Sequence, residues 1–254
     1  MQDLRVTLVQ ANQVWENPDA NYENYIQLLD GVETDLILLP EMFHTCFSMN
    51  LELAGDYEGS AAVQWLKELS ASKNAAIYTS LMVKDGEQHF NRGVFITPTG
   101  DITTYDKRKT FGLAKEDEYF ASGTDTTIVS YKDWKLNLQI CYDLRFPEIA
   151  RNKISNQSPI YDVLLYVANW PQKRSLHWKT LLRARAIENQ CFVVGVNRVG
   201  TDGNGFEYSG DSRLVDALGQ EHLLEKGIEM TKTFVMKKSE LGIIREKLPF
   251  LKDT

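Results

Sequence analysis

The sequence predicts an α/β fold, and three observations support this prediction. Short apolar runs alternate with segments of helical periodicity over about the first eighty residues. A meander of alternating residues follows, interrupted by turn signals at Asp85-Gly86 and Thr99-Gly100. Several apolar runs then end in polar or charged residues, and such strand ends carry the functional loops of α/β sheets.

The elements follow from these patterns in chain order. Helices are expected at 21–31 and near 60–73. Strands are expected near 5–11, 35–40, 76–81, 127–131, 135–141, 162–168 and 192–198. Between the last two strands, Trp178, Leu181 and Leu182 have helical spacing, and Arg185 continues the stripe three residues later. This position predicts a buried, paired arginine, for which an ion pair that holds the helix to the core is favoured over a substrate contact.

Length and composition predict one well-packed soluble domain over residues 1–254. Hydrophobic residues make up 43% of the chain, with charged residues interspersed among them. The formal net charge of −7 argues against nucleic acid and anionic membrane as partners, because both require a clustered basic surface. No apolar run approaches the roughly 20 residues that span a bilayer, and no leader pattern follows Met1, so we expect a cytoplasmic protein.

Three chemically distinctive residues come directly after predicted strands. Glu41 follows a short apolar run that ends in Pro40, and Lys107 follows an alternating stretch that ends in Asp106. Cys141 closes a third such stretch, immediately before a charged turn. Because active sites gather beyond strand ends in α/β sheets, we expect these three side chains to converge on one pocket.

A base, a cation and a thiol together predict an enzyme that cleaves amides. A thiol is mostly protonated near neutral pH, so a neighbouring group such as Glu41 must help Cys141 to become a nucleophile. Attack on an amide places negative charge on its carbonyl oxygen, which Lys107 and the backbone N–H of Tyr142 could stabilise. The acyl group would then form a thioester with the cysteine, which activated water would hydrolyse.

The other cysteines are interpreted as structural, because free cysteine usually behaves as a small buried hydrophobe. Cys191 opens the apolar run 191–196, and neither it nor Cys46 precedes a charged turn like the one after Cys141. Three widely spaced cysteines form no disulfide framework and no paired zinc spacing. Serine-hydrolase, His-Glu-x-x-His and dinucleotide-binding motifs are likewise absent from the sequence.

Three motifs in this order resemble the nitrilase (carbon–nitrogen hydrolase) superfamily, whose signature is a Glu-Lys-Cys triad. The segments 38–43, 105–109 and 140–148 are similar to its glutamate, lysine and cysteine motifs, and the resemblance covers nearly the whole chain. Within the superfamily, Asn169-Trp170-Pro171 followed by His177-Trp178 is most similar to the short bacterial omega-amidases.

The resemblance implies an αββα sandwich of two mixed sheets flanked by helices. It also implies hydrolysis of the terminal amide of a small 2-oxo acid such as 2-oxoglutaramate or 2-oxosuccinamate, without a metal or organic cofactor. A second glutamate often lies seven residues before a glycine in this family, and Gly123 thereby indicates Glu116 as a supporting carboxylate, with Glu118 as the alternative. A homodimer or higher homo-oligomer is expected.

Residues near the motifs are candidates for substrate binding. A 2-oxo dicarboxylic monoamide carries a carboxylate, so the pocket needs a cation, for which Arg145, Lys173 and Arg174 are candidates and Arg174 is favoured. Arg145 could instead pair with Glu148. Aromatic residues that adjoin the motifs could form the pocket wall, although an aromatic residue next to a strand end is more often part of the core packing. They are Phe43, Tyr142 and Trp170.

Two other classes of function remain open at this point. The same triad could cleave a different aliphatic amide, an N-carbamoyl group or a nitrile. Alternatively, the chain could be a non-catalytic binding or scaffold member of the fold. Such members usually tolerate the loss of a triad residue, whereas this sequence has all three residue types.

Overall fold

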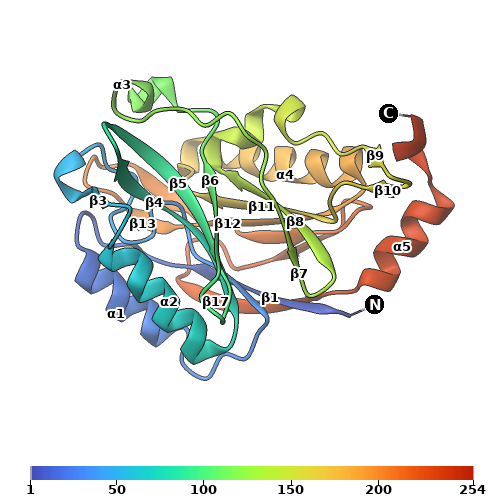
Figure 1. The fold of residues 1–254 in the computed structure, drawn as a ribbon, viewed down its shortest axis with the longest axis horizontal. Helices are drawn as coiled ribbons and strands as arrows, with labels where there is room; N and C mark the ends of the chain where they lie inside the picture. The colour runs from blue at the N-terminus through green and yellow to red at the C-terminus, as the bar shows by residue number, and fades with distance from the viewer. Residues whose placement is uncertain (1, 254) are drawn as a thin grey trace.

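The computed structural model describes residues 2–253 and contains two large mixed β-sheets (Figure 1). The first sheet has the order β17-β1-β2-β4-β5-β6, with β3 beside β4, and the second has the order β16-β15-β12-β11-β8-β7. The first sheet comprises β1 (Leu4–Gln10), β2 (Leu36–Leu38), β3 (Gly55–Asp56), β4 (Ala76–Asp85), β5 (Gln88–Ile96), β6 (Ile102–Asp106) and β17 (Met230–Met236). The second comprises β7 (Ile128–Tyr131), β8 (Trp134–Ile140), β11 (Val163–Ala168), β12 (Phe192–Asn197), β15 (Arg213–Val215) and β16 (Glu221–Leu223).

Helices cover the outer faces of both sheets. The helices α1 and α2 pack on the first sheet, and α4 packs on the second (Figure 1). This order of layers confirms the predicted αββα sandwich. The helices are α1 (Pro18–Leu28), α2 (Ala61–Lys73), α3 (Glu116–Tyr119), α4 (Ser175–Asn189) and α5 (Lys238–Lys247). Two small hairpins complete the strands: β9 (Ile154–Ser155) with β10 (Ser158–Pro159), and β13 (Val199–Thr201) with β14 (Glu207–Ser209).

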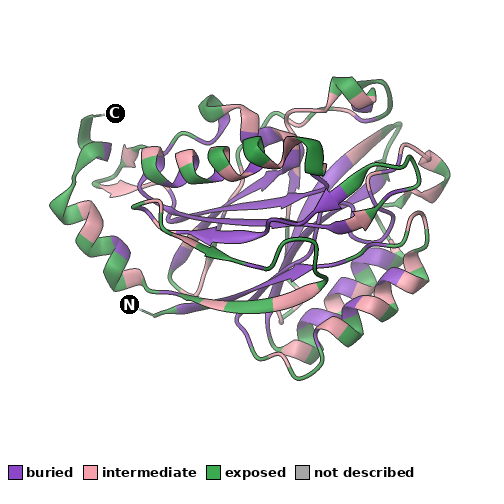
Figure 2. Cartoon of the chain, turned by 180° about the vertical axis from the view of Figure 1, so that it is seen from behind, coloured by how far each residue is buried: buried purple, intermediate pink, exposed green. Residues whose placement is uncertain are grey.

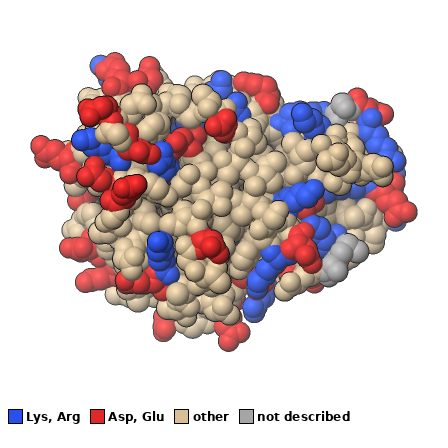
Figure 3. Space-filling model, viewed as in Figure 1, with Lys and Arg blue, Asp and Glu red and all other residues tan. Residues whose placement is uncertain are grey.

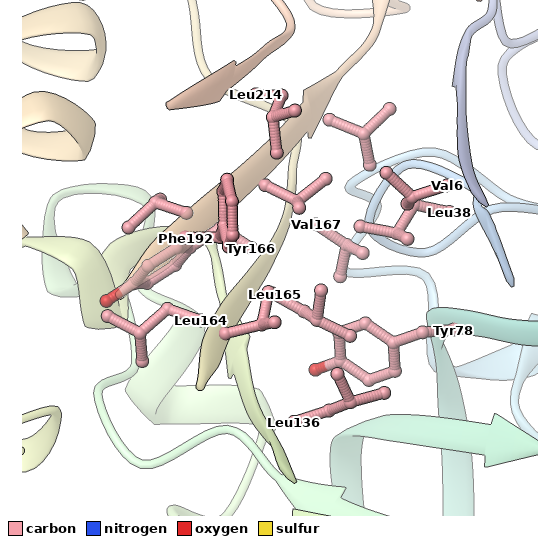
Figure 4. Close-up of a cluster of buried hydrophobic side chains, with 14 of the residues drawn as sticks. Val6, Leu38, Tyr78, Leu136, Leu164, Leu165, Tyr166, Val167, Phe192 and Leu214 are labelled. Atoms are coloured by element: carbon pink, nitrogen blue, oxygen red, sulfur yellow. The ribbon is translucent and has the colours of Figure 1, made fainter. Parts of the chain in front are cut away.

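Strand β2 shows why the apolar runs are nearly continuous. Leu36 and Leu38 face the core between the sheets, whereas Ile37 and Leu39 face the core beneath α1 and α2. A strand that is buried on both faces requires apolar residues at successive positions. Figure 2 shows the resulting buried strands between partly exposed helices. Figure 4 shows the core between the sheets, where Tyr78 of the first sheet lies near Leu136 of the second.

The helix boundaries follow from local capping. Helix α1 begins at Pro18, because the side chain of Asn17 accepts a hydrogen bond from the backbone N–H of Ala20 and proline is favourable in the first turn. The start expected at residue 21 was therefore three residues late. Helix α2 agrees with the expected range: the Ser60 side chain caps its first turn, and Asn74 ends it in the left-handed conformation.

The surface carries charges of both signs in an interspersed pattern. Figure 3 shows lysine and arginine side chains next to acidic ones around the edge of one face, with a broad uncharged band across its centre. Within residues 2–253, the structure contains no helix with the length and apolar character needed to cross a bilayer.

Candidate active site

The structure brings Glu41, Lys107 and Cys141 together from both sheets. Glu41 lies in the turn after β2, and Lys107 directly follows β6 of the same sheet. Cys141 follows β8 of the second sheet. The site therefore forms where strand ends of the two sheets face each other. Lys107 and Cys141 directly follow their strands and Glu41 lies three residues beyond β2, so each residue comes at or just after a strand end, as the apolar runs predicted.

Lys107 lies between two buried carboxylates. Its Nζ donates to Oε1 of Glu41 at 2.9 Å and to Oε2 of Glu116 at 2.8 Å, and both carboxylates are fully buried. Burial opposes the charge on the lysine, but Glu116 and Glu41 outweigh it and raise the pKa of Lys107. The lysine is thus held as an ammonium group at the base of the site.

Glu116, rather than Glu118, is the second carboxylate of the site. Its oxygens accept hydrogen bonds from Lys107 and from the backbone N–H of Phe111, the latter at 2.6 Å. Glu118 is exposed and pairs with Lys115 on the surface. Burial raises the pKa of Glu116, while Lys107 acts in the opposite direction. The groups of Lys107 and Phe111 that contact its oxygens can only donate hydrogen bonds, and this favours the ionised form of Glu116.

Two asparagines that the sequence analysis did not single out as site residues fix Glu41. The Asn91 side chain donates to Glu41 Oε1 at 2.8 Å and to Glu116 Oε1 at 3.1 Å. The backbone N–H of Asn169 donates to Glu41 Oε2 at 2.9 Å. Asn91 is a buried polar residue of β5, but Arg92 follows it directly and Gln88 and His89 precede it in the strand, so the sequence carries no clear signal for its role.

Cys141 presents its thiol at a sharp turn. Its φ is +43°, a conformation that non-glycine residues rarely adopt and that persists where the surroundings enforce it. The side chain is largely buried, and Sγ lies 3.9 Å from the carbonyl oxygen of Asn169. Burial and the nearby carboxylate of Glu41 raise the pKa of the thiol, so the resting cysteine is protonated near neutral pH.

Asp143 stabilises this turn through hydrogen bonds to its carboxylate. Its Oδ2 accepts from the backbone N–H of Ile140 at 2.9 Å and from the hydroxyl of Tyr105 at 2.8 Å, and its Oδ1 accepts from the backbone N–H of Lys109 at 2.9 Å. Burial raises the pKa of Asp143 to about 6, with these donors opposing the shift. The carboxylate thus links the segment before Cys141 to the segment after the site lysine.

Asp143→Asn is expected to lower stability and turnover together. Three donors surround the carboxylate, so an amide must turn its NH₂ group toward at least one of them. An unsatisfied buried donor costs about 1–3 kcal/mol of unfolding free energy. The displaced turn should lower kcat about tenfold or more with little change in KM, because the nucleophile would be misplaced rather than the pocket walls.

Urea unfolding and steady-state kinetics would measure both effects. Asp101→Asn provides the matched control, since its carboxylate caps an exposed turn with Thr97 and Thr99. A wild-type kcat in Asp143→Asn would contradict the positioning role.

Cys141 and Lys107 line a pocket of about 460 Å³, and Glu41 lies buried behind them in contact with Lys107. Its walls come from seven segments of the chain, which lie at residues 15–16, 47–50, 107, 111–114, 141–145, 169–174 and 202–208. The volume lies within the range of small-molecule sites, and most of the lining is apolar or aromatic.

Four of the predicted substrate-binding residues line this pocket. Tyr142, Arg145, Trp170 and Arg174 are all part of its wall. The guanidinium of Arg145 lies over the Trp170 ring at 4.7 Å, and the ring of Tyr142 contacts that of Phe111 at a centroid distance of 4.9 Å. Arg145 does not pair with Glu148, whose carboxylate lies 3.9 Å from Lys109.

Phe43 does not line the pocket, so its expected role in the pocket wall is wrong and the alternative of core packing holds. Its side chain is fully buried in the core beneath α1 and α2, and its ring contacts those of Tyr25 and Trp65. The turn after Glu41 explains this difference, because Met42 has a φ of +44° and residues adjacent in sequence point in different directions there. Lys173 is exposed and does not line the pocket.

Arg185 of helix α4 is buried and paired, as expected, but its ion pair lies within the helix, and a hydrogen bond rather than an ion pair links the helix to the cysteine turn. Arg185 is buried and pairs with Glu188 at 2.9 Å, and it donates to the carbonyl oxygen of Leu144 at 2.6 Å. This is a structural role. In the described part of the chain, residues 2–253, no group of three or more His, Cys, Asp and Glu side chains has a metal-binding arrangement.

The αββα sandwich brings together a thiol, a carboxylate and a buried ammonium group at one pocket. These are the groups that a hydrolase with a cysteine nucleophile requires. The carbon–nitrogen hydrolase family model matches residues 5–222. The chain belongs to the carbon–nitrogen hydrolase family and is an amide-hydrolysing enzyme. The resemblance inferred from the three motifs is thereby confirmed.

Named relatives agree with this assignment. The chain is 39% identical to an omega-amidase, YafV, of Yersinia enterocolitica, over all of this chain and 98% of the relative. It is 32% identical to a 2-oxoglutaramate amidase of Bacillus subtilis, over 88% of this chain and 86% of the relative. A solved structure, the CN-hydrolase superfamily protein XC1258 of Xanthomonas campestris with an arsenic adduct in its active site, matches with a TM-score of 0.97 and 40% identity. That match covers all of this chain and 98% of XC1258.

Proposed function

We propose that this enzyme is an omega-amidase that hydrolyses the terminal amide of a small 2-oxo dicarboxylic acid monoamide, such as 2-oxoglutaramate or 2-oxosuccinamate. The observation that carries the proposal is the pocket itself, which is lined by Cys141, by two arginines and by Lys107, the partner of Glu41. The names of the omega-amidase and 2-oxoglutaramate amidase relatives support the same substrate class.

The first half-reaction makes an acyl-enzyme. Glu41 takes the thiol proton as Cys141 attacks the amide carbon, and the raised pKa of the thiol makes this assistance necessary. The ammonium group of Lys107 and the backbone N–H of Tyr142 stabilise the negative charge on the amide oxygen. Glu41 returns its proton to the leaving nitrogen, so ammonia departs and a thioester with Cys141 remains.

The second half-reaction releases the acid. Glu41 takes a proton from a water molecule that attacks the thioester carbon, and the cysteine leaves with that proton as the free thiol. Glu116 does not exchange protons in this scheme. It supports the cycle by holding Lys107 in place, together with Asn91, through the hydrogen bonds that fix both carboxylates. No cofactor takes part in the scheme.

The arginines of the pocket wall suit the other end of such a substrate. Arg145 and Arg174 offer guanidinium groups that bind carboxylates in a planar, two-pronged geometry. Tyr142 and Trp170 then enclose the short carbon chain between the carboxylate and the amide. We further propose that residues 1–254 form one carbon–nitrogen hydrolase domain, which acts in the cytoplasm as a homodimer or larger homo-oligomer.

Ammonia release from a panel of amides tests the proposed activity. Purified enzyme is expected to release ammonia from 2-oxoglutaramate and 2-oxosuccinamate far faster than from glutamine or N-carbamoyl substrates. The physical reason is that the pocket supplies cations for one carboxylate and an apolar wall for the rest of the chain. Comparable or greater release from the N-carbamoyl compounds would overturn the assignment and favour another carbon–nitrogen substrate.

A further inference from the structure

The turn that carries Glu41 has an unusual backbone, which two side-chain amides hold in place. Met42 and Cys46 both have positive φ, at +44° and +63°, and such conformations persist where the surroundings enforce them. The backbone carbonyl of Glu41 accepts from Nδ2 of Asn169 at 2.5 Å and from Nε2 of Gln13 at 3.2 Å. The direction of the Glu41 side chain therefore depends on these two amides.

Arg198 fixes the residue that carries one of these amides. Its Nη2 donates to the backbone carbonyl of Gln13 at 2.8 Å, and its guanidinium lies over the ring of Tyr208 at 4.7 Å. The side chain is fully buried, and among residues 2–253 it forms no ion pair. Burying a cation without a carboxylate partner costs stability, and natural proteins accept such costs mainly at functional sites.

Asn197, the last residue of β12, fixes the segment that carries the other amide. Its Oδ1 accepts from the backbone N–H of Trp170 at 2.7 Å, and its Nδ2 donates to the carbonyl oxygens of Trp170 at 3.0 Å and Gly210 at 2.8 Å. Trp170 directly follows Asn169, whose backbone N–H donates to the Glu41 carboxylate. Because β11 and β12 are parallel neighbours, the segments that follow them leave the same edge of the sheet.

We propose that Asn197 and Arg198 are positioning residues that hold Glu41 in its catalytic orientation from two sides. This inference rests on the role of Glu41 as the base in the proposed function. Asn197 acts through the segment 169–170, and Arg198 acts through Gln13. Neither residue lines the pocket, so their effect on the reaction passes through these intermediaries. A misplacement of about 1 Å in a reacting group can lower the rate about 10²-fold.

Substitution at either position should change turnover rather than substrate binding. Arg198→Met and Asn197→Ala are each expected to lower kcat about tenfold to 10²-fold. The ratio kcat/KM should fall by the same factor, which is the signature of an interaction that acts in the transition state. Arg198→Lys keeps a donor for the Gln13 carbonyl and should recover part of the lost kcat. A rise in KM at wild-type kcat would instead show that these residues only support the pocket wall, where Tyr208 lies.

A double variant tests the route from Arg198 to the base. Gln13→Met removes the amide that contacts Glu41 but leaves Arg198 in place. Adding Arg198→Met to Gln13→Met should lower kcat no further than the larger single effect, because both substitutions interrupt the same connection. Losses that multiply would overturn this route. If Arg198→Met does not fold, Arg198→Lys with Gln13→Met gives the same comparison.

Arg245→Met is the matched control for loss of a buried arginine. Arg245 lies in α5, donates to the carbonyl oxygens of Tyr161 and Gln190, and does not line the pocket. Its substitution should lower the temperature of thermal unfolding while kcat stays at the wild-type value, and an equal loss of kcat here would overturn the positioning role. Kinetics are measured on the amide that the wild type hydrolyses fastest. A preferred amide outside the 2-oxo class would overturn the proposed substrate and leave this test valid.

Discussion

Cys141→Ala should eliminate ammonia release, with a loss of at least about 10⁴-fold in kcat and no loss of fold. Removing the nucleophile of a covalent hydrolase has an effect of this order or larger, because the carboxylate and the lysine cannot themselves accept the acyl group. The side chain is small, and although it packs at the main hydrophobic core it also lines the pocket. Its truncation should therefore cost little stability.

A continuous ammonia assay, with circular dichroism as a check of folding, measures this result. Mass spectrometry should also detect an acyl adduct on wild-type protein during turnover, and none on the variant. Cys191→Ala is the matched control: Cys191 is fully buried next to β12, so its loss should lower stability while activity persists. Residual turnover near wild-type rates in Cys141→Ala would contradict the proposed thioester route.

Lys107→Met should lose both activity and stability. Within residues 2–253, the Lys107 ammonium group is the only cation that lies within 4.0 Å of the Glu41 or Glu116 carboxylate. Both carboxylates are fully buried. Leaving buried charges unpaired costs about 3–5 kcal/mol of unfolding free energy. Loss of one donor to the developing oxyanion lowers kcat by about 10²–10³-fold, and displacement of Glu41 adds to this.

A double variant separates the two effects. Lys107→Met with Glu116→Gln removes one of the two stranded charges, so it should recover part of the unfolding free energy without recovering activity. Lys109→Met is the matched control, because Lys109 lies two residues away, is over one third exposed and contacts Glu148 only at 3.9 Å. An ammonia burst from Lys107→Met equal to that of the wild type would exclude an oxyanion role for this lysine.

Sequence patterns located the three principal site residues because each lies at the end of a strand. The order of apolar residues before Glu41, Lys107 and Cys141 predicts both the strands and their ends, and the structure places all three residues accordingly. The hydrogen-bond partners of these residues cannot be predicted in the same way. Asn91 contacts Glu41 from 50 positions away and Glu116 from 25, so only the folded sheet reveals that it belongs to the site.

Errors arose where local pattern and tertiary packing disagree. Phe43 follows Glu41 by two positions, yet a turn with positive φ directs its ring into the core beneath the helices. The final strand β17 was not predicted, because its residues alternate weakly and several are exposed. Its place beside β1 depends on pairing with a strand at the other end of the chain, which no local signal records.

The pairing of β17 with β1 has a consequence for biosynthesis. Leu4 pairs with Met236 and Gln10 with Met230, whereas the other neighbour, β2, pairs with only Val6, Thr7 and Leu8. The ribosome synthesises β1 long before β17. Until residues 230–236 have been synthesised, the growing polypeptide therefore has an open strand edge that is prone to pairing with other chains. The sheet that supplies two of the three catalytic candidates is completed only when β17 joins it.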